Sequence, residues 1–170
     1  MEKKYFLSSI NDENFCDIWH IMETCFASNE LRTYDSQLAI NRFDNYNTIA
    51  VSSDKEVVAF ATWWEFGWCT FLEYIAVIEC HRNKGIGTYI MKKIMQKEQL
   101  MVLEVNKKNL YNFHYYKSLG FCVNCYNYKA IPLKTEYKKV PNYYLMSYPR
   151  PFSQNEFDQF IGELSKSRYN

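Results

Sequence analysis

The sequence predicts a mixed α/β fold, and three observations lead to that prediction. The chain has 170 residues and is 48% hydrophobic, so it can bury a core of its own without disulfides. Its apolar residues recur at helical spacing near both ends, while short β-rich runs fill the middle. A strand, a loop, a helix and a further strand follow one another at the centre. No repeat or flexible linker interrupts this order, so we expect one domain, at most with an appendage.

The N-terminal segment predicts a short strand and two helices. Lys4–Ser9 is the strand-like run, and Asn11 and Asp12 behind it are candidate N-caps. The helix that follows carries apolar residues at three- and four-residue steps from Phe15 to Phe26, which give it one apolar face. After a polar stretch, a weaker pattern predicts a second helix near Asp35–Phe43.

Three β-rich runs in the middle of the chain predict an antiparallel meander. Polar residues at 53–56 and the pair Gly67-Trp68 supply the turns between the runs. The expected strands are Thr48–Ser52, Val57–Phe66 and Cys69–Ile78.

The second half of the chain predicts alternating helices and strands. Helical spacing returns over Gly85–Leu100, and Met101–Val105 is almost wholly apolar, as expected of a strand covered on both faces. A further helix over Asn109–Leu119 ends at Gly120, which serves as its C′ residue. The last two expected strands are Phe121–Lys129 and Val140–Tyr148.

A closing helix is expected after the last strand. Pro149 and Pro151 break the chain there, and the sequence from Ser153 to Glu156 is a capping box that opens the helix. We therefore divide the chain into a domain over residues 1–148 and a tail helix over residues 149–170. The tail is expected to pack on the domain or on a partner subunit.

Charge and composition exclude several function classes. Twenty basic and nineteen acidic residues give a formal net charge of +1, which predicts neither a nucleic-acid nor a membrane partner. No apolar run approaches the ~18 residues needed to span a bilayer, and we expect no signal peptide. The six cysteines lack framework spacing, so we expect reduced thiols and a cytoplasmic location. Neither the pair Cys122 and Cys125 nor the histidines suit a metal site, and no metal is expected.

The central loop predicts an anion site. It reads Arg82-Asn83-Lys84-Gly85-Ile86-Gly87, between a strand and a helix. The first helical turn has unpaired N–H groups and a positive dipole end, glycines allow close approach to a phosphate, and the two cations add charge. The loop lacks the pattern of a P-loop and the third glycine of a dinucleotide-binding fingerprint. A third pattern, Arg or Gln followed by x-x-Gly-x-Gly or Ala, is complete.

That third pattern is the pyrophosphate loop of acetyl-CoA enzymes, and the chain resembles the GNAT superfamily of N-acetyltransferases. The strand Leu72–Val77 is similar to the family's fourth strand, and Asn109–Phe121 is similar to its N-x-x-A-x-x-x-Y-x-x-x-G-F signature. Asn112 departs from the usual Ala. The resemblance implies the GNAT fold: a mixed, mostly antiparallel sheet of about seven strands with helices on both faces.

The resemblance also implies which residues meet acetyl-CoA. The fourth and fifth strands would splay apart, and the pantetheine arm would lie between them. Tyr116 matches the tyrosine that acts as general acid toward the CoA sulfur, and Asn109 matches the asparagine that bonds to the pantetheine arm. The implied cofactor-binding residues are Ile75, Ala76, Val77, Arg82, Asn83, Lys84, Gly85, Ile86, Gly87, Thr88, Asn109 and Tyr116.

Glu73 is the candidate general base. Alternation along the strand predicts that it shares one face with Phe71, Ile75 and Val77. A carboxylate in an otherwise apolar strand is costly unless it is paired or useful, so a structural salt bridge and a substrate-binding carboxylate are open alternatives. Further residues that could line the acceptor side are Glu30, Asp35, Glu65, Glu136 and Tyr137.

The resulting expectation is an acetyl-CoA-dependent N-acetyltransferase. It would acetylate a primary amine of a small molecule or peptide by direct transfer in a ternary complex, as a monomer or homodimer. The alternatives are a module that binds or senses acyl-CoA without turnover, and an interaction protein whose tail docks a partner.

Overall fold

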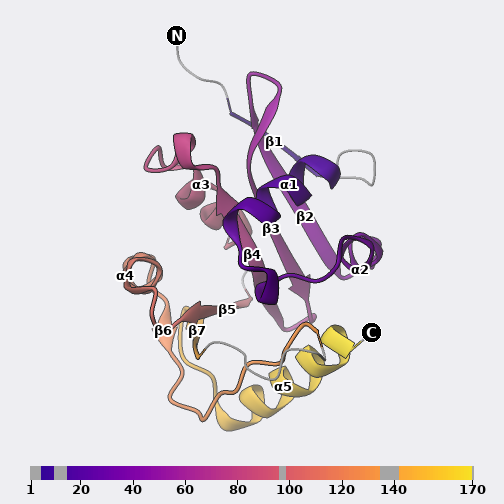
Figure 1. Cartoon of the computed structure of the whole chain (residues 1–170). Coiled ribbons are helices and arrows are strands. Elements are labelled where there is room, and N and C mark those ends of the chain that lie inside the picture. Colours follow the sequence, from indigo (N-terminus) through magenta and orange to yellow (C-terminus); the bar gives the residue numbers. More distant parts are fainter. Residues whose placement is uncertain (1–4, 10–14, 96–98, 135–141, 170) are drawn as a thin grey trace.

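The computed structural model describes residues 5–9, 15–95, 99–134 and 142–169 of the chain. These residues form a seven-stranded sheet in the order β1-β2-β3-β4-β5-β7-β6 (Figure 1). All neighbouring strands are antiparallel except β4 and β5, which are parallel. The strands are β1 (Tyr5–Ser9), β2 (Tyr46–Ser53), β3 (Glu56–Glu65), β4 (Cys69–Val77), β5 (Leu100–Asn106), β6 (Cys122–Val123) and β7 (Tyr143–Tyr148).

Helices cover both faces of this sheet, so the expected fold class is confirmed. Among the described residues the helices are α1 (Phe15–Cys25), α2 (Tyr34–Ile40), α3 (Ile86–Ile94), α4 (Leu110–Ser118) and α5 (Gln154–Tyr169), with short 3-10 turns at Ser28–Glu30 and Glu79–His81. On one face α3 packs against alternate residues of β3 such as Ala59 and Ala61. On the other face α1 packs against Phe60 and α5 packs against Phe71.

The C-terminal helix is part of the core of this chain. Phe160 and Leu164 of α5 are fully buried against β4, β5 and β7. The expected capping box is present, because the Ser153 amide donates to the Glu156 carboxylate at 2.7 Å and the Glu156 amide donates to Ser153 Oγ at 3.3 Å. No helix within the described ranges is both long and apolar enough to cross a membrane.

Two expected elements were too long. The helix predicted over Gly85–Leu100 covers only Ile86–Ile94, because Leu100 already pairs with Cys69 at the start of β5. The strand predicted over Phe121–Lys129 is reduced to Cys122 and Val123.

Beside the short β6 strand, the Asn124 amide still donates to the Leu145 carbonyl of β7 at 2.9 Å. The Asn124 side chain donates to the Leu145 carbonyl and accepts from the Phe152 amide, so it ties β7 to the turn before α5. The candidate caps Asn11 and Asp12 and the start of the strand predicted from Val140 lie outside the described residues. The second helix begins at Tyr34, capped by Thr33 Oγ1.

Candidate active site

The site begins where two parallel strands separate. Residues 69–72 of β4 pair with residues 100–103 of β5, and the pairing stops after Leu72 and Leu103. Beyond that point β4 continues to pair with β3 on its other side. The backbone edge of residues 73–77 therefore faces a gap instead of a strand, as the resemblance implied, and an extended ligand can pair with it.

One cavity of about 660 Å³ lies along this gap and the start of α3. Ile75, Ala76 and Val77 of β4 form one wall, and the loop before α3 forms the end of the cavity. The other wall comes from α4 and the residue before it. The lining residues among the predicted cofactor set are Ile75, Ala76, Val77, Arg82, Asn83, Gly85, Ile86, Gly87, Thr88, Asn109 and Tyr116. Lys84 does not line it and donates to the Cys80 carbonyl instead.

The loop at the end of this cavity has the backbone of an anion cradle. Asn83 and Gly85 both have positive φ, at 60° and 78°, which turn the chain sharply into α3. Nothing lies within 4 Å of the position that a Cβ of Gly85 would occupy, so this side of the loop is open. The N–H groups of the first turn of α3 have no partner within the helix, and Arg82, which donates to the Val77 carbonyl at 3.0 Å, holds the loop against β4.

A second cavity, of about 680 Å³, opens on the other side of the separated strands. Its walls come from both ends of the chain: the turn after α1, residues 72–75 and 103–106, and residues 130–133, 143 and 168. The two cavities share Cys25, Phe26, Ile75, Asn109, Tyr111, Asn112 and Tyr116 among their lining residues. A ligand in one cavity therefore meets a ligand in the other between Ile75 and α4.

Tyr116 and Asn109 lie at this junction. Tyr116 is only 7% exposed, and burial raises the pKa of its hydroxyl above the ordinary value. The hydroxyl is therefore protonated at neutral pH and can donate a proton. Asn109 caps α4, since its side chain accepts from the Asn112 amide at 3.0 Å, and it still lines both cavities.

Glu73 shares a face with Phe71 as expected, but its expected place beside Ile75 and Val77 was wrong, because β4 contains a bulge. Tyr74 pairs with Thr62 and Leu72 pairs with Trp63, so Glu73 is an extra residue without a partner in β3. The bulge reverses the alternation of side chains. Ile75 packs on the α3 face, whereas Glu73 lies with Phe71 on the face covered by α2 and α5.

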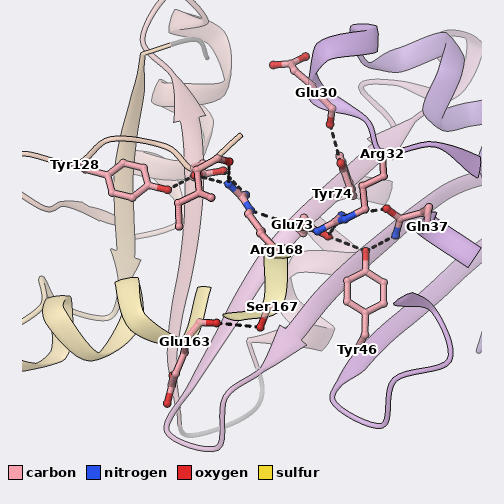
Figure 2. A network of polar contacts seen from close by, with 12 residues as sticks. Glu30, Arg32, Gln37, Tyr46, Glu73, Tyr74, Tyr128, Glu163, Ser167 and Arg168 are labelled. Atoms are coloured by element: carbon pink, nitrogen blue, oxygen red, sulfur yellow. Dashed lines mark hydrogen bonds and ion pairs between the residues drawn. The ribbon is translucent and has the colours of Figure 1, made fainter. Parts of the chain in front are cut away.

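Glu73 is held in a buried ion pair (Figure 2). Arg32 donates to both of its carboxylate oxygens, at 2.8 and 2.9 Å, and Tyr46 donates at 3.0 Å. The carboxylate is 2% exposed. Burial by itself would raise the pKa of Glu73, but the attraction of Arg32, helped by Arg168 and Tyr46, outweighs it and lowers the pKa below its ordinary value. Of the alternatives open at the sequence level, the salt bridge is present.

Several polar residues of the second cavity were not predicted. Glu104 of β5 pairs with Arg168 of α5 at 2.9 Å and accepts from the Tyr128 hydroxyl. Tyr143 donates to Glu30 at 2.8 Å. The only sequence signal for Glu104 was that an acidic residue interrupts the apolar run of β5. No sequence signal pointed to Arg168.

The acids predicted on the acceptor side do not all line the second cavity. Glu30 lines the second cavity, whereas Asp35 and Glu65 are not among its described lining residues. Glu136 and Tyr137 lie outside the described residues. Within the part of the chain that is described, no group of His, Cys, Asp or Glu is arranged to hold a metal ion.

The residues present fit CoA. The first cavity combines an unpaired strand edge, an open glycine and a helix N-terminus, which suit an amide-containing arm and a pyrophosphate. Arg82 and Asn83 line the pyrophosphate end, and Asn109 lines the arm.

Comparison with known proteins agrees with this geometry. A sequence model of the acetyltransferase (GNAT) family matches residues 15–121. No curated protein sequence matches the chain. The match ends at Phe121, so it contains the loop before α3 and the whole of α4 but not β7 or α5.

Solved structures share the fold at low sequence identity. A protein assigned to the GNAT family from Bacteroides thetaiotaomicron is 19% identical, with a TM-score of 0.82 over 94% of this chain and 95% of that one. The ribosomal-protein-S18-alanine N-acetyltransferase of Escherichia coli is 18% identical, with a TM-score of 0.68 over 88% and 96%. Arabidopsis thaliana Naa50, in complex with the bisubstrate analogue CoA-Ac-MVNAL, is 15% identical, with a TM-score of 0.64 over 84% and 97%.

Proposed function

Because the chain belongs to the GNAT acetyltransferase family, we propose that it transfers an acetyl group from acetyl-CoA directly to a primary amine of a small molecule or peptide. The observation that carries the proposal is the junction of the two cavities at Ile75 and Tyr116. With CoA along the first cavity and the amine in the second, both substrates are bound at once, and no enzyme-bound acetyl group is needed.

The first cavity, the cofactor cavity, binds acetyl-CoA in this proposal. The edge of residues 75–77 pairs with the pantetheine arm, and the loop from Arg82 to Thr88 receives the pyrophosphate on the first turn of α3. Asn109 fixes the arm from the other wall. Acetyl-CoA supplies the activated acyl group as a thioester. A backbone N–H of the unpaired β4 edge is the donor available to an oxyanion there.

Tyr116 acts as the general acid. Its hydroxyl is protonated at neutral pH, because burial raises its pKa above the ordinary value. It can therefore give its proton to the sulfur as the C–S bond breaks, and the proton that the amine loses on forming the C–N bond restores the hydroxyl. Burial removes competing water from around the hydroxyl, which strengthens that hydrogen bond.

Glu73 contributes a fixed charge to the second cavity, the acceptor cavity, in which the amine would bind. A direct role as base remains a prediction, and the ion pair counts against it because a carboxylate with a lowered pKa accepts a proton less readily. We propose instead that Glu73 and Arg32 together hold the bulge of β4 in place. The amine would then bind beside Glu30 and Tyr143, which line the same cavity.

The experiment is a transfer assay with acetyl-CoA and a panel of amines. The panel contains peptides that begin with alanine, the peptide Met-Val-Asn-Ala-Leu, spermidine and free lysine. Product mass and released thiol are measured for the native chain and for Tyr116→Phe. Gly85→Glu tests the cofactor half alone: it should weaken CoA binding measured by calorimetry, since the new side chain fills the open side of the loop. Wild-type affinity in Gly85→Glu would remove the cradle assignment.

A module that binds acyl-CoA without turnover is the second candidate. Asn112, which lines both cavities where the family usually has Ala, is the observation that favours it, because a polar side chain occupies the junction. Tight CoA binding without product across the panel would support this candidate.

A further inference from the structure

We infer that Arg168, in the last turn of α5, is a positioning residue of the acceptor cavity. Its guanidinium spans the point where β4 and β5 separate and holds the walls of the cavity at a fixed distance. The expected effect of Arg168 on the KM for the amine rests on the proposed function. Its effect on the distance between the walls of the cavity does not. Arg168 lies far outside residues 15–121, which carry the family match.

The contacts of Arg168 join three segments (Figure 2). Its Nη2 donates to Glu104 Oε2 of β5 at 2.9 Å, and its Nε lies 3.9 Å from Glu73 Oε1 of β4. Its Nη1 donates to the Ile131 carbonyl at 2.7 Å. The guanidinium also lies 5.5 Å from the centre of the Phe71 ring, which fixes the depth to which it enters the fold.

Burial and charge make the guanidinium necessary at this position. The side chain of Arg168 is 4% exposed, and those of Glu73 and Glu104 are 2% and 13% exposed. Two carboxylates on neighbouring strands would repel one another at such burial without a cation between them. The charges alternate from Arg32 through Glu73 and Arg168 to Glu104, and the neutral hydroxyls of Tyr46 and Tyr128 complete the contacts of the two carboxylates.

Arg168 contacts residues that line the acceptor cavity and none of the described ones that line the cofactor cavity. Glu73, Glu104, Ile131 and Arg168 all line the acceptor cavity. None of the four is among the described residues that line the cofactor cavity. Loss of the guanidinium should therefore change the binding of the amine and leave the binding of CoA unchanged.

The test compares Arg168→Gln, Arg168→Lys and the control Arg150→Gln in the full chain. Arg150 also pairs with a carboxylate, that of Glu156, but its side chain is 56% exposed and is not among the described residues that line either cavity. The KM for the best amine of the panel should rise about tenfold in Arg168→Gln, as expected for displaced walls of a binding site. The KM for acetyl-CoA and the CoA dissociation constant should stay within about twofold.

Arg168→Lys should recover part of the amine KM, because lysine keeps the charge but cannot contact Glu104 and Ile131 together. Equal losses in the Lys and Gln variants, or equal rises in both KM values, would reduce Arg168 to a general stabiliser and overturn the inference. An amine KM at the wild-type level in Arg168→Gln would also overturn it.

Hydrogen–deuterium exchange supplies a measurement that needs no turnover. In Arg168→Gln, peptides covering residues 100–106 and 126–134 should exchange faster, while residues 82–94 keep their protection. If no amine is acetylated by the native chain, the proposed function fails, and this exchange pattern still decides the inference. Unchanged exchange in residues 126–134 would refute it.

Discussion

Replacing Glu73 by glutamine should destabilise the protein by about 3 to 5 kcal/mol, the cost of leaving a buried ion without its partner. The structure places Glu73 at the upper part of this range. Arg32 makes two bonds to it, both side chains are at most 4% exposed, and glutamine offers one carbonyl oxygen instead of two charged ones. Gln37, the other contact of Arg32, carries no charge that could compensate.

Chemical denaturation measures this free energy, with Arg150→Gln as the matched control. The control removes an equally short ion pair, at 2.8 Å, whose arginine is 56% exposed, and it should cost less than about 1 kcal/mol. For a chain of this length each kcal/mol corresponds to roughly 2–4 °C of melting temperature. Glu73→Gln should therefore melt at least about 6 °C below the native chain.

The pH dependence of stability gives the same pair a second test. The pKa of Glu73 is lower in the folded state than in the unfolded state, in which a Glu titrates near about 4.3. The stabilising contribution is therefore complete above the unfolded pKa and is lost as the pH falls through the folded one. The difference in unfolding free energy between the native chain and Glu73→Gln should be constant at neutral pH and shrink below about pH 4.

A small loss of stability in Glu73→Gln would refute this reasoning. If the variant unfolds within about 1 kcal/mol of the native chain while kcat falls by about a hundredfold or more, Glu73 is a base and not a structural anion. The opposite result, a large loss of stability with wild-type kcat at a temperature where both are folded, agrees with the ion pair.

Three further predictions concern other parts of the fold. Tyr116→Phe should lower kcat about a hundredfold with little change in CoA affinity. In the native chain the raised pKa keeps Tyr116 protonated, so steady-state assays should show no loss from this group up to about pH 10. Gly85→Ala should destabilise by about 1–2 kcal/mol in thermal unfolding, because alanine is strained at φ 78° although it has space. Ser153→Ala should cost about 1 kcal/mol through loss of the cap on α5, and Ser165→Ala, later on that helix, is its control.

The cofactor half of the site was readable from the sequence because its residues are close together in the chain. One stretch of the chain, from Ile75 to the end of α4 at Ser118, contains residues 75–77, the loop from Arg82 and the helix with Tyr116. This stretch is about half as long as an ordinary domain or shorter. Each has a local physical signal: an apolar strand, a glycine-rich turn before a helix, and a capped helix that ends at Gly120. Local signals of this kind can be recognised without knowledge of the tertiary structure.

The position of Glu73 was not readable, because a bulge has no local signature here. A single extra residue in β4 reverses the face of every side chain on one side of it. Simple alternation therefore placed Glu73 beside Ile75, whereas the structure places it beside Arg32. The same limit applies to β6, which is shorter than the β-rich sequence predicted and is followed by Asn124, whose side chain accepts from the distant Phe152 amide.

The acceptor half differs from the cofactor half in how it is assembled. Arg32 lies just before α2 and Arg168 is in the last turn of α5, yet both contact Glu73 on the central strand. Glu73 and Glu104 lie just beyond the point where β4 and β5 separate, and the buried arginines that neutralise them come from segments distant in the chain. The cofactor cavity can therefore keep its shape while the C-terminal segment varies, but the acceptor cavity cannot. It follows that the residues which select the amine are expected after Phe121, outside the family match, and in the turn between α1 and α2.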